Sequence, residues 1–260
     1  MHNNQYNTTM KRFFSIMMAV ALMFGFAACN SSNAKVGVDS KNDKSLTYDG
    51  RKVTKQLKSL PYFNKVVLDG ALDVEFSQAS RGGVAVKGRK SIVDNVRAKV
   101  KNQTLYLSLD EKDWFRVDRS EKADIYVSSP DLISVVMRGA GDFEAKNLLD
   151  TDTLNVELNG AGNIDFDRIV CDEAYLVVKG AGNLEVDKLT ANRTKIAMLG
   201  VGNADVEFVN AGHVDCLLKG VGNIDLEGNV NSLKKSVQGT GNIDTTELMV
   251  RGSRKLSLEN

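Results

Sequence analysis

The sequence has few of the residues on which most catalytic and metal sites depend. Among 260 residues there are two histidines, three cysteines, one tryptophan and two prolines. So few imidazole and thiol groups leave little material for a zinc site or for imidazole catalysis. Scarce proline, together with 22 glycines set among short runs of Val, Leu and Ile, favours strands over helices.

An excess of charge of one sign is also lacking. The 34 basic and 33 acidic residues give a formal net charge of +1 at pH 7. This balance provides no electrostatic reason to expect nucleic acid or an anionic membrane surface as a partner. The hydrophobic content of 42% is nevertheless enough to build a core.

The N-terminus carries an apolar run that is too short to span a membrane. Met10-Lys11-Arg12 precedes 14 mostly apolar residues, Phe13 to Phe26. A basic start, a short apolar stretch and small residues are typical of a secretory signal peptide, whereas a transmembrane helix needs about 20 residues. We therefore assign residues 1–28 to a signal peptide.

The end of this run, Phe26-Ala27-Ala28-Cys29, resembles a bacterial lipobox with Phe where Leu is commoner. The resemblance implies cleavage before Cys29, lipidation of Cys29, and attachment to a membrane through the acyl chains. The alternative is an ordinary signal peptide followed by an incidental cysteine. Residues 29–45 are small, polar and charged without periodicity, so they are predicted to be a flexible tether.

The most regular feature of the chain is a six-residue motif that occurs six times, as in Gly-Ala-Gly-Asn-Ile-Asp at 160–165. Its first glycines lie at 139, 160, 180, 200, 220 and 239, with separations of 21, 20, 20, 20 and 19 residues. Such a steady period predicts a stack of near-identical coils. The structural repeat positions are Gly160, Gly162, Asn163, Gly180, Gly182, Asn183, Gly200, Gly202, Asn203, Gly220, Gly222, Asn223, Gly239, Gly241 and Asn242.

Within each copy the apolar residues and both glycines share one parity, as from Leu154 to Phe166. Period-two alternation indicates strands whose apolar residues face inward and whose Asn and acidic residues face outward. We expect the glycines to provide space and φ freedom at an inward corner. A third apolar position follows nine residues after the first glycine, at Leu148, Ile169, Leu189, Val209 and Leu248.

The sequence thus predicts an all-β protein, a right-handed parallel β-helix with rungs of ~20 residues. The head spans 46–250, with an irregular front half to about 135 and regular repeats over 136–250, followed by a basic tail at 251–260. In the front half, Val66 to Phe76 is a degenerate copy of the repeat. Further strands are expected at 84–86, 96–100, 105–109 and 125–127, and the one candidate helix at 90–99.

Stacking places two polar columns on the outside of the coil. The Asn column is predicted to form an amide ladder. The acidic column comprises Glu144, Asp165, Glu185, Asp205, Asp225 and Asp244. Like charges this close repel each other, and Arg138, Lys179 and Lys219 could interleave only if the columns are adjacent. We expect no metal or cofactor, with calcium on Asp165, Glu185, Asp205, Asp225 and Asp244 as the alternative.

No catalytic residues are expected, because the acids form a uniform column and an active site is a local exception to a pattern. His213 has no nearby partner in the sequence, and Cys216 is read as a small core residue. A disulfide between Cys171 and Cys216 is not expected, because the two cysteines occupy different places in their rungs. The Trp114-Phe115 pair either folds a loop onto the core or grips a sugar ring or a partner.

The repeated motif, the opening segment Phe63 to Gly70 and Pro130-Asp131-Leu132 resemble the head GIN domain of putative auto-transporter adhesins, over about residues 60–250. The resemblance implies a β-helix with an adhesive role, in a lipoprotein or secreted protein of Bacteroidetes-type bacteria. It carries over no catalytic residues.

We therefore expect a non-enzymatic outer-membrane lipoprotein that serves as an adhesin or as a structural or binding surface. Its partners would be the membrane, through the lipid anchor, and a glycan or protein ligand on the head, with no nucleic acid. The face of the membrane and the oligomeric state are left open. The alternative is a carbohydrate-binding or carbohydrate-active β-helix of the lyase or glycosidase type.

Overall fold

The structure is a computed structural model, and it describes residues 52–57, 60–110 and 123–252. These residues lie within one compact unit, Thr47–Asn260. The predicted signal peptide and tether, Cys29, Trp114 and residues 253–260 of the tail lie outside the described residues. The described part contains one short helix, α2 (Lys90–Val93), and is otherwise built from strands, so the prediction of an all-β fold is confirmed.

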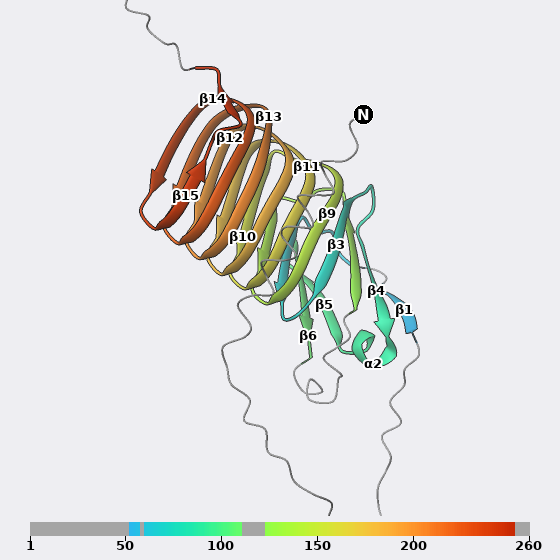
Figure 1. The fold of residues 1–260 in the computed structure, drawn as a ribbon. Coiled ribbons are helices and arrows are strands. Elements are labelled where there is room, and N and C mark those ends of the chain that lie inside the picture. Colours follow the sequence, from blue (N-terminus) through green and yellow to red (C-terminus); the bar gives the residue numbers. More distant parts are fainter. Residues whose placement is uncertain (1–51, 58–59, 111–122, 253–260) are drawn as a thin grey trace, which may run out of the picture. The chain divides into compact units, whose positions relative to one another are not determined.

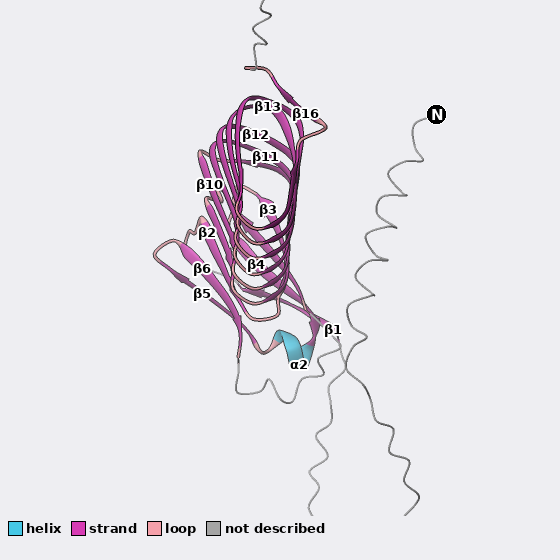
Figure 2. Cartoon of the chain, turned by 60° about the vertical axis from the view of Figure 1, so that its left-hand side comes forward, coloured by secondary structure: helices cyan, strands magenta, loops and turns pink. Residues whose placement is uncertain are grey.

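Between residues 134 and 250 the chain winds about six turns of a parallel β-solenoid with rungs of about 20 residues. Figure 1 shows these turns stacked side by side, and Figure 2 shows them as loops with two long sides. The strands are β8 (Ser134–Met137), β9 (Ala140–Asp150), β10 (Thr153–Leu158), β11 (Ala161–Val178), β12 (Ala181–Met198), β13 (Val201–Leu218), β14 (Val221–Val237), β15 (Thr240–Asp244) and β16 (Leu248–Val250).

The repeat copies pair in equivalent register. Between β11 and β12, Gly162 lies opposite Gly182, Asn163 opposite Asn183, and Asp165 opposite Glu185. The same pairing continues through β13, β14 and β15. A residue's place in the repeat therefore fixes its column in the stack, as the period predicted.

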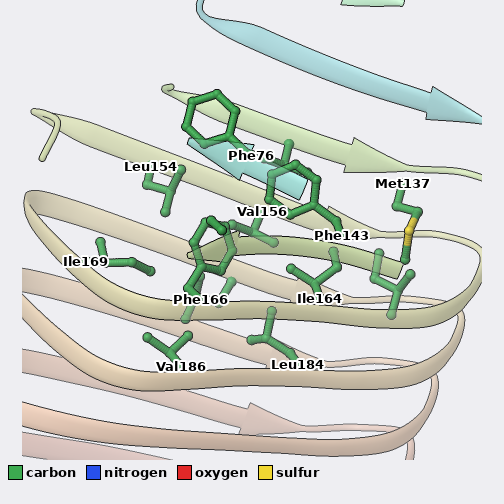
Figure 3. Close-up of a cluster of buried hydrophobic side chains, with 14 of the residues drawn as sticks. Phe76, Met137, Phe143, Leu154, Val156, Ile164, Phe166, Ile169, Leu184 and Val186 are labelled. Carbon is green, nitrogen blue, oxygen red and sulfur yellow. The ribbon is translucent and has the colours of Figure 1, made fainter. Parts of the chain in front are cut away.

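The inward parity forms the core. Phe76, Phe143 and Phe166 come from three successive layers, with ring centroids 6.3 Å apart for the first pair and 5.7 Å for the second (Figure 3). Pairs of aromatic rings at such distances add about 0.5–1.5 kcal/mol beyond the burial of their area. This cluster joins the front half of the chain to the regular repeats.

The front half begins with a rung of its own. β2 (Lys65–Asp69) pairs in parallel with β8, and β3 (Asp73–Gln78) pairs in parallel with β9. Between them Gly70, with φ of +115°, occupies the corner where the repeats have their first glycine. The prediction that this segment is a degenerate copy of the repeat is confirmed.

The remaining strands of the front half form a mixed sheet. β6 (Thr104–Leu109) and β7 (Asp124–Ser129) add a further parallel layer next to β2 and β3. Antiparallel strands follow at this end: β5 (Val96–Lys101) on β6, β4 (Gly83–Arg89) on β7, and β1 (Lys52–Leu57) on β4. The antiparallel strands flank the parallel layers, so this end of the stack differs from the repeats.

The predicted helix at 90–99 is wrong over most of its length. Only Lys90–Val93 is helical, and residues from Val96 onward pair with β6. Val96 is buried, Arg97 is exposed and Val100 packs against the core. This period-two pattern fits the pleat of a strand, and the partner strand supplies the hydrogen bonds.

The first glycine of each copy lies at a bend between strands, as expected, and contact between rungs excludes a side chain at the glycines. A Cβ on Gly202 would lie 1.8 Å from the carbonyl oxygen of Gly182, and one on Gly222 would lie 1.7 Å from that of Gly202. Both residues also have positive φ, +151° and +146°, which L side chains rarely adopt. The obstacle is therefore the backbone of the preceding rung.

The third apolar column differs from its prediction at two rungs. Leu148 is exposed and Leu149 is buried, while Phe208 is buried in place of Val209. The reason is a change of register beside an asparagine with positive φ in each rung. The observed column consists of four buried residues, Leu149, Ile169, Leu189 and Phe208, and two half-buried ones, Gly228 and Leu248.

Within the described residues, no helix is both long enough and apolar enough to cross a membrane.

Candidate functional site

The asparagine column forms a chain of hydrogen bonds along the stack. Asn183 Nδ2 donates to Asn163 Oδ1 at 2.9 Å, and Asn203 Nδ2 donates to Asn183 Oδ1 at 3.3 Å. Asn163 Nδ2 in turn donates to Asp142 Oδ1 at 2.8 Å. From Asn203 to Asn223 the contact changes to a bond from the backbone N–H, at 3.3 Å. These groups satisfy one another from rung to rung, so their role is in folding.

Next to this ladder, the outward side of the strands that follow the glycines carries two columns of acidic residues. One column has one carboxylate per rung, and it begins with Glu75 opposite Glu144 in the front half. A second column, two residues further along, was not anticipated from the sequence, although the same alternation points to it. We call these residues together the acidic face: Glu144, Asp165, Glu185, Asp205, Asp225, Asp244, Asp167, Asp187, Glu207 and Glu227.

Burial and mutual repulsion perturb the pKa values on the acidic face. Partial burial, then the charges of Asp225 and Glu185, raise the pKa of Asp205 to about 7. Partial burial, then the charges of neighbouring carboxylates, raise the pKa of Asp165 to about 6. The pKa of Glu185 is raised by burial and by Asp187. Carboxylates with such values are partly protonated near neutral pH, which relieves the repulsion along the column.

Among the described residues, the ion pairs made by the main column lie at its N-terminal end. Lys146 Nζ lies 3.3 Å from Glu75 Oε2 and 3.0 Å from Glu144 Oε2, and hydrogen bonds to both carboxylates raise the pKa of Lys146. Arg138 and Lys179 do not interleave with the acids. They pair with Asp69 at 3.8 Å and Glu157 at 2.9 Å, on the other long side of the rungs.

The arrangement of the acids does not resemble a calcium site. Asp165, Glu185, Asp205, Asp225 and Asp244 lie one per rung along a column, whereas Ca²⁺ takes about 6–8 converging oxygen ligands. In the part of the chain that the structure describes, no three His, Cys, Asp or Glu side chains are grouped to hold a metal ion.

The histidine and the two cysteines of the described residues either form a hydrogen bond with a neighbouring rung or are buried. His213 Nδ1 is 2.8 Å from Ser232 Oγ on the next rung, and His213 is exposed. Cys171 and Cys216 are buried free thiols, and burial raises their pKa values to about 11 and about 12. A thiol with so high a pKa is a poor nucleophile at neutral pH, because it is the thiolate that reacts.

The other long side of each rung carries an outward column that sequence reasoning did not single out. It consists of Val67, Val136, Glu157, Val177, Ala197 and Leu217, which lie opposite one another from strand to strand. We call its five apolar members the apolar stripe. Apolar residues at outward positions break the alternation, and this was the signal available in the sequence.

These features define a class of protein, a parallel β-solenoid whose repeat motif is used for stacking and whose two long sides present continuous surfaces. The chain belongs to a known family within that class. The family model described as "Putative auto-transporter adhesin, head GIN domain" matches residues 62–187 and 174–254.

A solved structure agrees with this assignment. The chain is similar to a putative adhesin from Bacteroides fragilis NCTC 9343, with 25% identity and a TM-score of 0.64, over 75% of this chain and 97% of that one. A putative adhesin from Parabacteroides merdae ATCC 43184 gives a weaker likeness, with 15% identity and a TM-score of 0.47, over 75% and 97% of the two chains. None of the curated proteins matches the chain.

Proposed function

We propose that the protein is a non-enzymatic adhesin head held at the bacterial cell envelope by a lipid on Cys29. The observation that carries the proposal is the use of the repeat motif. Its glycines and asparagines make contacts between rungs, and the outward positions of the two long sides of the rungs remain available to contact a partner. The family match and the similarity to the Bacteroides fragilis structure support an adhesive role.

The anchor and the tether complete the proposal. Residues 29–45 are 17 in number and would reach about 56–61 Å if fully extended. A lipid on Cys29 with this tether would hold the head away from the outer membrane while leaving its faces accessible. The partner of the head would then be a glycan or a protein on another surface.

The anchor is tested by growing the expressing bacterium with a fatty-acid probe. The wild-type protein should take up the label, and Cys29→Ala should lose it. Cys171→Ala is the matched control, because it removes a buried free thiol of the head and should keep the label. Label retained in Cys29→Ala would overturn the proposed anchor.

The adhesive role is tested by protease treatment of intact cells, followed by incubation of the purified protein with a glycan panel and a polysaccharide panel. Cleavage of the head on intact cells is expected, because an adhesin must be exposed. Retention on a glycan without new chain ends supports binding. New reducing or unsaturated ends would show an enzyme, and protection from the protease would rule out direct adhesion.

A further inference from the structure

The apolar stripe is an unusual feature for the outside of a β-solenoid. Val67 and Ala197 are each only 7% exposed although their parity points outward. In the flanking columns, Tyr175 is 37% exposed and Leu199 is 40% exposed. A stripe of this kind, flanked by exposed apolar groups, is typical of an interaction surface.

Lysines border the C-terminal half of the stripe. Lys195 and Lys234 belong to the column on one side, two rungs apart, with Asp215 between them. Lys219 belongs to the column on the other side, next to Leu199. For the described residues, no ion pair within 4.0 Å involves these three lysines, in contrast to Lys179, whose Nζ is 2.9 Å from Glu157. We call Lys195, Lys219 and Lys234 the lysine rim.

The acidic face has the charge and the spacing that complement this border. It carries one carboxylate per rung in its main column, and within the described ranges no ion pair within 4.0 Å involves Asp165 or Asp205. Rungs are spaced ~4.8 Å apart, so Lys195 and Lys234 are separated by about 10 Å along the stack. A second solenoid with the same rung spacing therefore presents carboxylates at the levels of Lys195 and Lys234.

We propose that the apolar stripe and the lysine rim are a docking surface for the acidic face of a second copy of this chain, placed side by side with its rungs aligned. The contact is heterologous, because different faces of the two copies meet. One copy keeps its acidic face unused and the other keeps its docking surface unused, so further copies can add and form a row of heads. The proposal goes beyond the adhesive role and does not depend on it.

The size of the contact predicts its strength. Six rungs at ~4.8 Å extend about 29 Å, and five residues across a strand extend about 17 Å, which gives roughly 500 Å² per copy. The total of about 1,000 Å² lies at the lower end of specific interfaces, where association is weak and transient. Association should therefore appear at high concentration and low ionic strength, because opposite charges drive it.

Sedimentation velocity of the mature, full-length protein in a non-ionic detergent tests the proposal. Wild-type protein should self-associate with rising concentration at ~20 mM salt and become monomeric at ~500 mM salt, where charges are screened within about 4 Å. The double variant Lys195→Glu, Lys219→Glu should stay monomeric. Lys55→Glu, Lys87→Glu changes the same charge on β1 and β4, and should associate like the wild type.

A charge swap gives the decisive measurement. Asp205→Lys, Asp225→Lys should also be monomeric, and its mixture with Lys195→Glu, Lys219→Glu should associate again, because each variant keeps a face that fits the other. Circular dichroism identifies any variant that has not folded, and the lysine variant alone still tests the docking surface because its positions are exposed.

Three outcomes would overturn the proposal. One is a wild-type protein that is monomeric at low salt and high concentration. The second is self-association that persists in Lys195→Glu, Lys219→Glu or strengthens with salt. The third is a monomeric wild type whose lysine rim binds a polyuronate, which would assign the surface to an anionic glycan.

Discussion

Lys235 lies one rung beyond Cys216 in the same inward column, so the last rung places an ammonium group where earlier rungs place apolar side chains. Its Nζ is 3.0 Å from Thr245 Oγ1 and 3.4 Å from the carbonyl oxygen of Ile243. The lysine stem covers the end of the core while its charge stays hydrated. A charge at an exposed strand edge opposes pairing with another chain.

Lys235→Leu should therefore make the C-terminal end of the solenoid prone to aggregation. We expect aggregation that light scattering detects and that added salt does not suppress, because the new contact is apolar. Lys235→Arg keeps the charge and should remain as soluble as the wild type. Equal scattering from Lys235→Leu and Lys235→Arg would show that the charge does not protect this end.

Gly222→Ala should destabilise the solenoid strongly. The new Cβ would overlap the carbonyl oxygen of Gly202, and the residue would keep a positive φ. We expect a loss of about 4 kcal/mol or more, or failure to fold, as is typical of backbone strain combined with overpacking. Urea unfolding followed by circular dichroism measures it, with Val221→Ala, at a position 50% exposed, as a control expected to change stability by about 0.5 kcal/mol or less. A wild-type midpoint for Gly222→Ala would contradict the close backbone contact.

Asn183→Ala should remove a link of the amide ladder. Asn183 Oδ1 accepts from the backbone N–H of Asn203 at 3.1 Å and from its Nδ2 at 3.3 Å. Because these groups are partly buried, we expect a cost of about 1–2 kcal/mol in the free energy of unfolding. Thermal unfolding followed by circular dichroism measures this loss. Asn155→Ala is the control, because its side-chain amide makes a single long hydrogen bond of 3.4 Å, and it should lower the free energy of unfolding by less. Equal costs would argue against a ladder that stabilises the stack.

The acidic face should make the protein more stable in mild acid. The pKa of Asp205 is about 7 in the folded protein against an ordinary value of 3.8, so the folded state binds more protons between these values. The contribution of Asp205 to the free energy of unfolding should then fall as the pH rises from ~4 to ~7, and it should stay constant above pH ~7. Asp205→Asn should raise the melting temperature at pH ~8 by about 3 °C, corresponding to roughly 1 kcal/mol after discounting for solvent screening.

The pKa of Asp244 is shifted in the opposite direction to that of Asp205, so its effect on stability has the opposite dependence on pH. Hydrogen bonds from Thr246 lower the pKa of Asp244, so the stability it adds is present above its ordinary pKa and is lost in acid. Asp244→Asn should lower the melting temperature at pH ~8 rather than raise it. Equal effects of the Asp205 and Asp244 substitutions would contradict the difference in their environments.

Removal of divalent cations should leave the melting temperature unchanged. The carboxylates of the acidic face lie in columns along the stack, and in the described part of the chain no three acidic, His or Cys side chains are grouped to hold a metal ion. A chelator added at pH ~8, where the acids are most charged, is the most sensitive condition. A fall of several degrees, reversed by added calcium, would instead show that the acidic column binds the ion.

The repeat period and the alternation predicted most of the solenoid. In a parallel stack each residue lies next to its counterpart one period later, so the columns of Asn163 and Asp165 follow directly from sequence spacing. The third apolar column was wrong at Leu148 and Val209, because Asn147 and Asn210 adopt positive φ where the register changes. An asparagine near a corner was the only local sign of that change.

The topology of the front half could not be derived in the same way. β6 and β7 follow β2 and β3 in sequence but lie on the side away from the repeats, and no local pattern encodes this order. The role of Lys235 at the end of the core could have been predicted from the sequence, because a lysine on the inward parity conflicts with a buried position. The conflict is resolved only when that rung is known to be the last one that runs the full length.

The contact between equivalent glycines has a consequence for how such a head changes in length. Each rung fits its neighbour through the same backbone contacts, so duplication or loss of a whole 20-residue unit preserves every contact of the remaining rungs. A single-residue insertion inside a strand would instead turn its core residues outward. The reach of the head therefore changes in steps of one rung, about 4.8 Å each.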